Sequence, residues 1–261
     1  MKEYLAQQKK YSVLNLVRRN GSISLSHLSA TIGLDRKGVK CFLDELKGEG
    51  LIRQKKLGPS TGGRRPQLFE LDPRFGIAVG VDIGLTHTRA VAVNIKDERV
   101  GQEIRETRTG QELVEGVMGT ITHLLAGRKH PPLLGIGMAM AGLSDPDKAS
   151  MIFSPKFGNV RNLPLGQIVG DRFGVPVTLQ GNAGAMALGE QAFGMGRGTD
   201  DFVCVNMATG IGLGIVINGE LYRGTSGYAG ELGHIVVEPT GPRCVCGNYG
   251  CLEVMASGLA I

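Results

Sequence analysis

Three of the five cysteines in this chain of 261 residues lie within eight residues of one another, and this cluster restricts the local fold more than any other feature. Cys244, Cys246 and Cys251 follow His234 in the sequence. Three sulfurs and one imidazole are a donor set that binds Zn²⁺ tetrahedrally. The spacing favours this site over a disulfide framework or reduced free thiols. Four protein ligands leave no position for water, so we expect structural zinc.

The positive charge of the chain is concentrated at one end. Residues 1–75 contain 15 Lys and Arg against 7 Asp and Glu, a formal charge of +8, whereas the whole chain has +5. A compact basic module attracts phosphate backbones, although an inert solvated surface can have the same charge. No signal peptide pattern or membrane-length apolar run occurs, so we expect a cytoplasmic protein.

The first 50 residues contain the signals of three helices. Helical spacing of apolar residues predicts the first over residues 11–19. Ser24 is a suitable N-cap for a short second helix, which Gly33 ends. Asp35 is a suitable N-cap for a third helix that continues to about Lys47. Its apolar residues fall on one stripe, which predicts a buried face: Val39, Phe42, Leu43 and Leu46.

A basic, glycine-rich loop follows, between a strand that begins at residues 51–53 and a strand at 68–71. Three helices, a strand, a basic loop and a returning strand are the element order of a winged helix-turn-helix, which we expect over residues 1–72. The alternative is a disordered, charged linker. In a winged helix, the first turns of the third helix meet DNA and the loop tip enters a minor groove. The expected DNA-binding residues are Arg36, Lys37, Lys40, Arg64 and Arg65.

The remainder of the chain alternates strand and helix signals, which predicts an α/β domain over residues 76–261. Strands are expected at 77–84, 90–93, 133–142, 175–179, 202–206 and 213–217, and helices at 113–125 and 183–193. Asn218-Gly219 is a hairpin turn signal. The turn after the first strand has Asp82, Gly84 and Thr86, a combination that can hold phosphate or Mg²⁺ but is weak evidence alone.

Three segments resemble the repressor branch of the ROK family (repressors, open reading frames, kinases). They are 80–86, which is similar to the first phosphate loop of the family, 209–212 through 227–234, and 244–253. The resemblance implies an actin-like, RNase H-like fold with a sugar cleft between two lobes. It implies a sugar pocket lined by Glu231, His234 and Glu253, and zinc held by the His234 and cysteine cluster. Thr209 and Gly210, with the turn at 82–86, would be the remnant of a phosphate site.

The sequence departs from the kinase members of this family at the expected catalytic base. Their Glu-Asn-Asp-Ala-Asn run aligns with residues 180–184, which places Asn182 where the base Asp would stand and Gly181 where an amide would stand. An amide cannot accept the proton of a sugar hydroxyl, although Asn182 can still form a hydrogen bond with one. Leu85 and His87 replace residues that are usually glycine and lysine in the phosphate loop. We therefore expect no enzyme activity.

These features predict a sequence-specific repressor of carbohydrate metabolism genes that binds double-stranded operator DNA as a homodimer and responds to a sugar or sugar derivative. One alternative is an ATP-dependent ROK sugar kinase, and another is a ligand-independent DNA-binding protein with a degraded sensor domain. The family's chains continue well past the cysteine loop, whereas this chain ends at Ile261 in an expected helix that starts after Glu253. The second domain is therefore expected to be incomplete.

Overall fold

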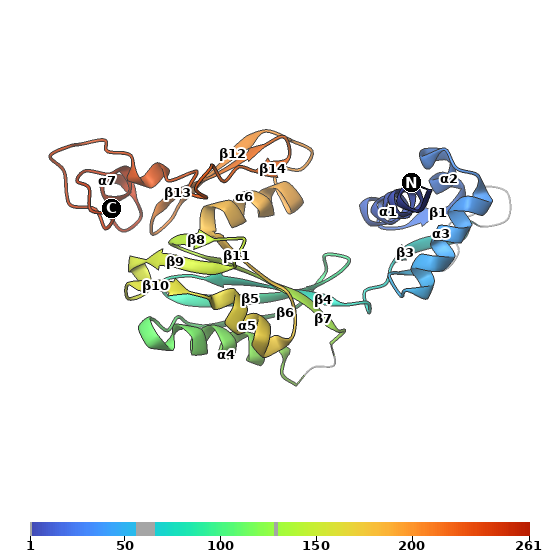
Figure 1. Cartoon of the computed structure of the whole chain (residues 1–261), viewed down its shortest axis with the longest axis horizontal. Coiled ribbons are helices and arrows are strands. Elements are labelled where there is room, and N and C mark those ends of the chain that lie inside the picture. The colour runs from blue at the N-terminus through green and yellow to red at the C-terminus, as the bar shows by residue number, and fades with distance from the viewer. Residues whose placement is uncertain (1, 56–65, 128–129) are drawn as a thin grey trace. The chain divides into compact units, whose positions relative to one another are not determined.

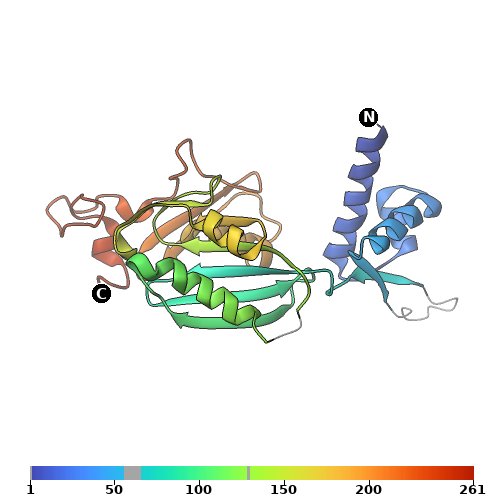
Figure 2. The same cartoon turned by 60° about the horizontal axis from the view of Figure 1, so that its bottom comes forward.

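The computed structural model describes residues 2–55, 66–127 and 130–261, which form two compact units. The first unit consists of Met1–Ala78, Ala92–Gly101 and Gly127–Leu134, and the second of Val79–Val91, Gln102–Ala126 and Gly135–Ile261. Figures 1 and 2 show the elements of both units. None of the helices in the described part of the chain has both the length and the apolar character that a membrane span requires.

The N-terminal part of the first unit contains three helices and a small antiparallel sheet. The helices are α1 (Lys2–Asn20), α2 (Leu25–Ile32) and α3 (Arg36–Gly48). The strands β1 (Ile23–Ser24), β2 (Ile52–Lys55) and β3 (Leu68–Leu71) pair in the order β1-β3-β2. Helix α1 begins nine residues before the predicted start. The sequence prediction missed these first turns because residues 2–10 are mostly polar and lack an apolar stripe.

The predicted helix caps are confirmed. The hydroxyl of Ser24 accepts a hydrogen bond from the backbone N–H of His27, and the carboxylate of Asp35 accepts one from that of Gly38. Gly33 ends α2 with a φ of 70°, a conformation that glycine adopts without steric cost. The predicted stripe of α3 packs into the core of this module, with Val39, Leu43 and Leu46 fully buried and Phe42 partly buried.

The central sheet has five strands in the order β11-β7-β4-β5-β6. These are β4 (Ile77–Ile83), β5 (His87–Asn94), β6 (Arg99–Glu106), β7 (Leu133–Met140) and β11 (Val177–Gly181). Helices α4 (Leu113–Leu125) and α5 (Leu165–Phe173) cover one face of this sheet, as both views show (Figures 1 and 2). Strands β7 and β11 pair in parallel, and the mixture of strands and helices in this unit confirms the predicted α/β class.

Two further sheets and a helix complete the second unit. β8 (Leu143–Asp145), β9 (Ser150–Ser154) and β10 (Val160–Leu163) form one antiparallel sheet. β12 (Phe202–Met207), β13 (Ile211–Ile217) and β14 (Glu220–Leu221) form the other, against which α6 (Asn182–Phe193) packs. The β13–β14 turn has positive φ at Asn218 and at Gly219, as the predicted hairpin turn requires.

The last helix starts earlier and is shorter than the helix that was predicted after Glu253. Helix α7 spans Leu252–Ala256, so it begins before Glu253 and ends five residues before the last residue. Its end is defined by Ser257, whose backbone is extended (φ −77°, ψ 166°) and whose N–H donates to the carbonyl of Glu253.

Candidate functional site

A cavity of about 550 Å³ lies within the second unit. Its wall comes from the segments that follow β7 and β9, from the start of α6, from β13 and the turn before it, and from residues 227–231. Asn182, Glu231, His234 and Glu253, the residues predicted to bind sugar, all line this cavity, and so do Thr209 and Gly210. Residues distant in sequence therefore meet around one concave pocket with several convergent polar groups, the usual form of a small-molecule site.

Asn182 occupies the first turn of α6. Its Oδ1 atom is buried, and no described residue donates a hydrogen bond to it. A buried carbonyl oxygen without a donor costs about 1–3 kcal/mol, so such atoms in cavities are normally satisfied by a ligand or by water. The side chain is therefore suited to accept a hydrogen bond from a hydroxyl group in this cavity.

Glu253 is nearly buried, and both of its carboxylate oxygens have protein partners. Its Oε1 lies 2.9 Å from Nζ of Lys156, and its Oε2 accepts a hydrogen bond of 2.9 Å from the backbone N–H of Ile211. A Cβ at Gly210 would lie 2.4 Å from Oε2 and 2.7 Å from Nζ, so only glycine fits at this position. Lys156 had no sequence signal, because a lone lysine between two strands has no characteristic pattern.

Glu231 and His234 lie three residues apart on a short segment that ends in a 3-10 helix, Leu232–His234. The Oε2 of Glu231 is 3.6 Å from Nε2 of His234. Burial in the cavity wall, together with the negative charge of Glu253, raises the pKa of Glu231, and the charges of His234 and Lys156 oppose that rise only in part. Gly230 permits this segment to approach β13, since its φ is 93° and a Cβ would lie 1.9 Å from the carbonyl oxygen of Leu213.

The four predicted metal ligands converge. The ligand atoms of His234, Cys244, Cys246 and Cys251 all lie within 4.8 Å of one another. Nδ1 of His234 is 3.5 Å from the sulfur of Cys244, and the sulfurs of Cys246 and Cys251 are 3.7 Å apart. A tetrahedral ion with bonds of about 2.0–2.3 Å separates its ligands by roughly 3.3–3.8 Å. The two separations of 3.5 and 3.7 Å lie in this range.

The loop that holds the cysteines is closed by its own backbone. The N–H of Cys244 donates to the carbonyl of Asn248, and that of Gly250 to the carbonyl of Pro242. Gly250 has a φ of 61°, and a Cβ there would lie 1.5 Å from the carbonyl oxygen of Glu238. Only glycine fits this close backbone contact, which lets the loop turn back toward Cys251. Burial and the neighbouring sulfurs raise the pKa of the Cys251 thiol to about 12.

The predicted phosphate-loop residues fall into two groups. Thr209 and Gly210 line the cavity, whereas Asp82, Gly84 and Thr86 lie at the β4–β5 turn and are not among the described residues of its wall. Asp82 faces Arg89 at 3.4 Å, and the N–H of Gly84 donates to the carbonyl of His87. The turn is therefore closed by its own hydrogen bonds and ion pair.

The candidate nucleic-acid interface is the beginning of α3. Arg36, Lys37 and Lys40 are all exposed there, and none of them belongs to the buried stripe. The guanidinium of Arg36 donates to the hydroxyl of Ser26 on α2, which links the two helices. Arg64 and Arg65 lie outside the described residues.

Comparisons with known proteins place these features in context. Residues 78–261 match the sequence model of the ROK family. The chain is 33% identical over 253 residues to the xylose repressor of Bacillus subtilis strain 168, a match that covers 95% of this chain and 65% of that protein. The chain thus spans about two thirds of the length of this curated relative.

Solved structures similar to this chain include a regulator and a kinase. A ROK family transcriptional regulator, described as a homologue of the E. coli MLC protein, has a TM-score of 0.78 and 26% identity and covers 98% of this chain and 66% of its own. A ROK family glucokinase from Streptomyces griseus, in complex with glucose and AMPPNP, has a TM-score of 0.65 and 36% identity. This second match covers 71% of this chain and 58% of the glucokinase.

Proposed function

Because this chain belongs to the ROK family, we propose that it is a sequence-specific DNA-binding repressor that responds to a sugar or sugar derivative and controls genes of carbohydrate metabolism. One observation carries this proposal: a single chain joins a three-helix module with an exposed basic helix to a unit with a polar cavity. The similarity to the xylose repressor supports it, because that match covers 95% of the chain and so includes both parts.

The N-terminal part acts as a winged helix-turn-helix in this proposal. Helix α3 is the recognition helix, its N-terminal cations meeting base edges and phosphates, and the loop between β2 and β3 is the wing. The residues assigned to DNA contact are Arg36, Lys37, Lys40, Arg64 and Arg65. A homodimer would place two such helices on half-sites about one helical turn apart, or a multiple of it.

The cavity holds the effector. Asn182, Glu231, His234 and Glu253 supply the polar groups that recognise hydroxyls. The buried oxygens of Asn182 and Glu253 would discriminate strongly against a ligand that lacks a matching hydroxyl. The His234 and cysteine cluster holds structural zinc, which would bind Nδ1 of His234 and fix the orientation of the imidazole. Its Nε2 then remains free to act in the cavity beside Glu231.

Sugar kinase activity is the second candidate, favoured by the similarity to the Streptomyces griseus glucokinase. It is opposed by Asn182, since an amide at the position of the base cannot remove a proton from a sugar hydroxyl. Incubation with ATP and a panel of aldoses and N-acetylhexosamines distinguishes the two, because sustained formation of ADP that depends on one sugar would contradict the assignment as a non-enzyme.

DNA binding is tested with a fragment that the wild-type protein selects from a random-sequence pool. Lys37→Glu and Lys40→Glu are expected to weaken binding at least tenfold, because each replaces an attraction for phosphate with a repulsion. Lys47→Glu is the matched control, since Lys47 is an exposed lysine in the last turn of the same helix. Equal losses in all three variants would refute the assignment of the first turns of α3. D-xylose and other sugars are then added at fixed salt, and a shift in affinity with one of them identifies the effector class.

A further inference from the structure

The turn between β5 and β6 belongs to the same compact unit as the three-helix module. The turn is held rigid by Asn94, which is nearly buried. Its Oδ1 accepts hydrogen bonds from the backbone N–H groups of Lys96 and Glu98, and its Nδ2 donates to the carboxylate of Glu98. The conformation of the turn is therefore set by its own hydrogen bonds.

Three consecutive residues of this turn contact the N-terminal module, each by a different kind of interaction. Ile95 packs against the apolar core that the three helices and the small sheet share. Nζ of Lys96 lies 3.4 Å from Oε2 of Glu70 on β3. Asp97 faces Arg18 of α1 at 4.0 Å, an exposed pair that contributes little. The apolar contact and the Lys96 pair are thus the principal attachments of the turn.

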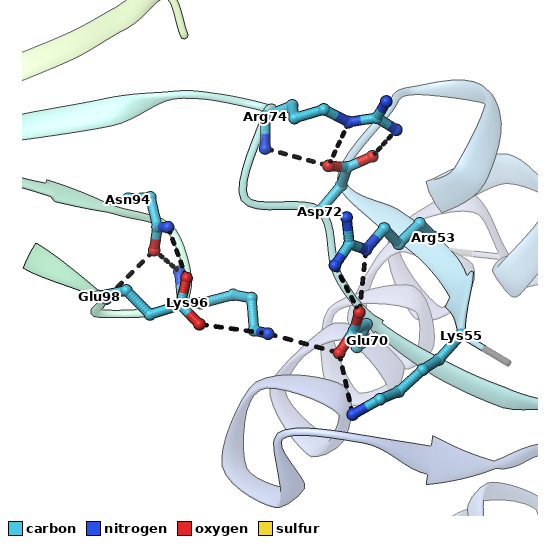
Figure 3. A network of polar contacts seen from close by, with 8 residues as sticks. All are labelled: Arg53, Lys55, Glu70, Asp72, Arg74, Asn94, Lys96 and Glu98. Atoms are coloured by element: carbon cyan, nitrogen blue, oxygen red, sulfur yellow. Dashed lines mark hydrogen bonds and ion pairs between the residues drawn. The ribbon is translucent and has the colours of Figure 1, made fainter. Parts of the chain in front are cut away.

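Glu70 is the centre of a cluster of three cations (Figure 3). Its side chain is only 4% exposed. Arg53 on β2 donates to Oε1 at 2.9 Å, while Nζ of Lys55 and Nζ of Lys96 approach Oε2 at 3.6 and 3.4 Å. Burial alone would raise the pKa of Glu70, but the hydrogen bond from Arg53 and the charge of Lys96 outweigh it and lower the pKa. The carboxylate is therefore ionised and depends on these cations.

Lys55 and Lys96 share one oxygen atom but differ in what else they can reach. Lys96 is 22% exposed and is held in the turn, whereas Lys55 is 51% exposed and is the last described residue before the basic loop. A carboxylate that retains Lys96 has its charge compensated without Lys55. In this structure Lys55 still pairs with the same oxygen, by the longer of the two lysine contacts.

We propose that Lys96 is a positioning residue for DNA binding, which compensates Glu70 and thereby releases Lys55 for contact with the phosphate backbone. This role rests on the proposed DNA-binding function. When Lys96 is removed, Lys55 becomes the only lysine beside Oε2 among the described residues, and the attraction of a nearly buried carboxylate holds it there. The DNA contact is lost although Lys96 itself touches no phosphate.

The test uses the full chain and the DNA fragment that the wild-type protein selects. Lys96→Met is expected to weaken binding about three- to tenfold and to reduce the slope of log affinity against log salt by about one, the signature of one lost phosphate contact. Lys96→Arg is expected to restore both. Lys148→Met is the matched control, because Lys148 also lies in a strand-connecting turn and pairs with an acidic neighbour, Asp145.

A double-mutant cycle separates this role from a general loss of structure. If Lys96 acts through Lys55, Lys55→Met combined with Lys96→Met binds no more weakly than Lys55→Met alone. Additive losses, or an unchanged salt slope in Lys96→Met, overturn the proposal while the DNA-binding function stands. A wild-type chain that selects no DNA sequence refutes the proposed function, and the role of Lys96 with it.

Discussion

Replacing Glu253 with Gln tests the polar contacts that shape the cavity. The wild-type carboxylate accepts from two donors at 2.9 Å, Nζ of Lys156 and the N–H of Ile211. Glutamine has one acceptor oxygen and one NH₂ group, so in Glu253→Gln one of these donors must face another donor. The ammonium of Lys156, which is only 21% exposed, also loses its counterion.

These two losses set the expected decrease in the free energy of unfolding. A hydrogen bond to a charged group contributes about 1.5–3 kcal/mol, and removal of one partner of a buried pair costs more than a surface pair would. Glutamine retains one acceptor, so we expect a net loss of about 3 kcal/mol. For a unit of this size that corresponds to a fall in Tm of roughly 6–12 °C.

The assay is thermal unfolding of the larger unit, followed by circular dichroism. Glu220→Gln is the matched control, since Glu220 is an exposed carboxylate on β14, and its Tm should stay within about 1 °C of wild type because surface substitutions are nearly neutral. Lys156→Met added to Glu253→Gln should recover part of the loss, because it removes the uncompensated charge. If Glu253→Gln has the same Tm as Glu220→Gln, the ion pair and the backbone hydrogen bond do not stabilise the unit and the reasoning is wrong.

Three other perturbations have defined outcomes. A strong zinc chelator should lower the Tm of the wild type by several degrees, and added Zn²⁺ should restore it. Cys246→Ser should have a Tm below that of the untreated wild type, with or without chelator. A wild-type Tm that the chelator leaves unchanged would exclude a stabilising metal. Because folding lowers the pKa of Glu70, its contribution to stability is complete above its ordinary value of about 4.5 and is lost as the pH falls through the folded value. Between pH 6 and 3, the free energy of unfolding of the first unit, measured in urea, should therefore fall more steeply with pH in wild type than in Glu70→Gln. Parallel pH dependences of the two proteins would contradict this. Asp35→Ala should lower the free energy of unfolding by about 1 kcal/mol, because it removes the cap of α3. Urea unfolding measures this loss, and Asp44→Ala is the control, since Asp44 is an exposed acid on the same helix. Equal losses in the two variants would mean that the cap does not stabilise the helix.

Local elements were predictable where a short segment contains its own signal. The caps at Ser24 and Asp35 act over three residues, so the sequence alone located the starts of α2 and α3. The bounds of α4 were predicted to the residue, because its apolar face is regular over thirteen residues. By contrast β6, with mostly polar and partly exposed residues, gave no alternation to detect.

The candidate site was predictable in part for the same reason. The cysteines are close in sequence, so their joint role could be inferred, and the structure brings His234 to them. Asn182 and Glu253 were identified through a family resemblance and indeed line one cavity. Lys156 was missed because its importance depends on Glu253, almost one hundred residues further along the chain.

The sequence by itself determined the helix caps, the cluster of cysteines, the basic N-terminal region and the α/β class, because each depends on spacing, charge or composition within a short stretch. Only the tertiary structure decided which charged groups meet. It placed Lys96 beside Glu70, Lys156 beside Glu253 and Ile95 against the core of the N-terminal module. Long-range pairs of this kind leave no periodicity in the sequence, because chain folding alone sets the distance between their side chains.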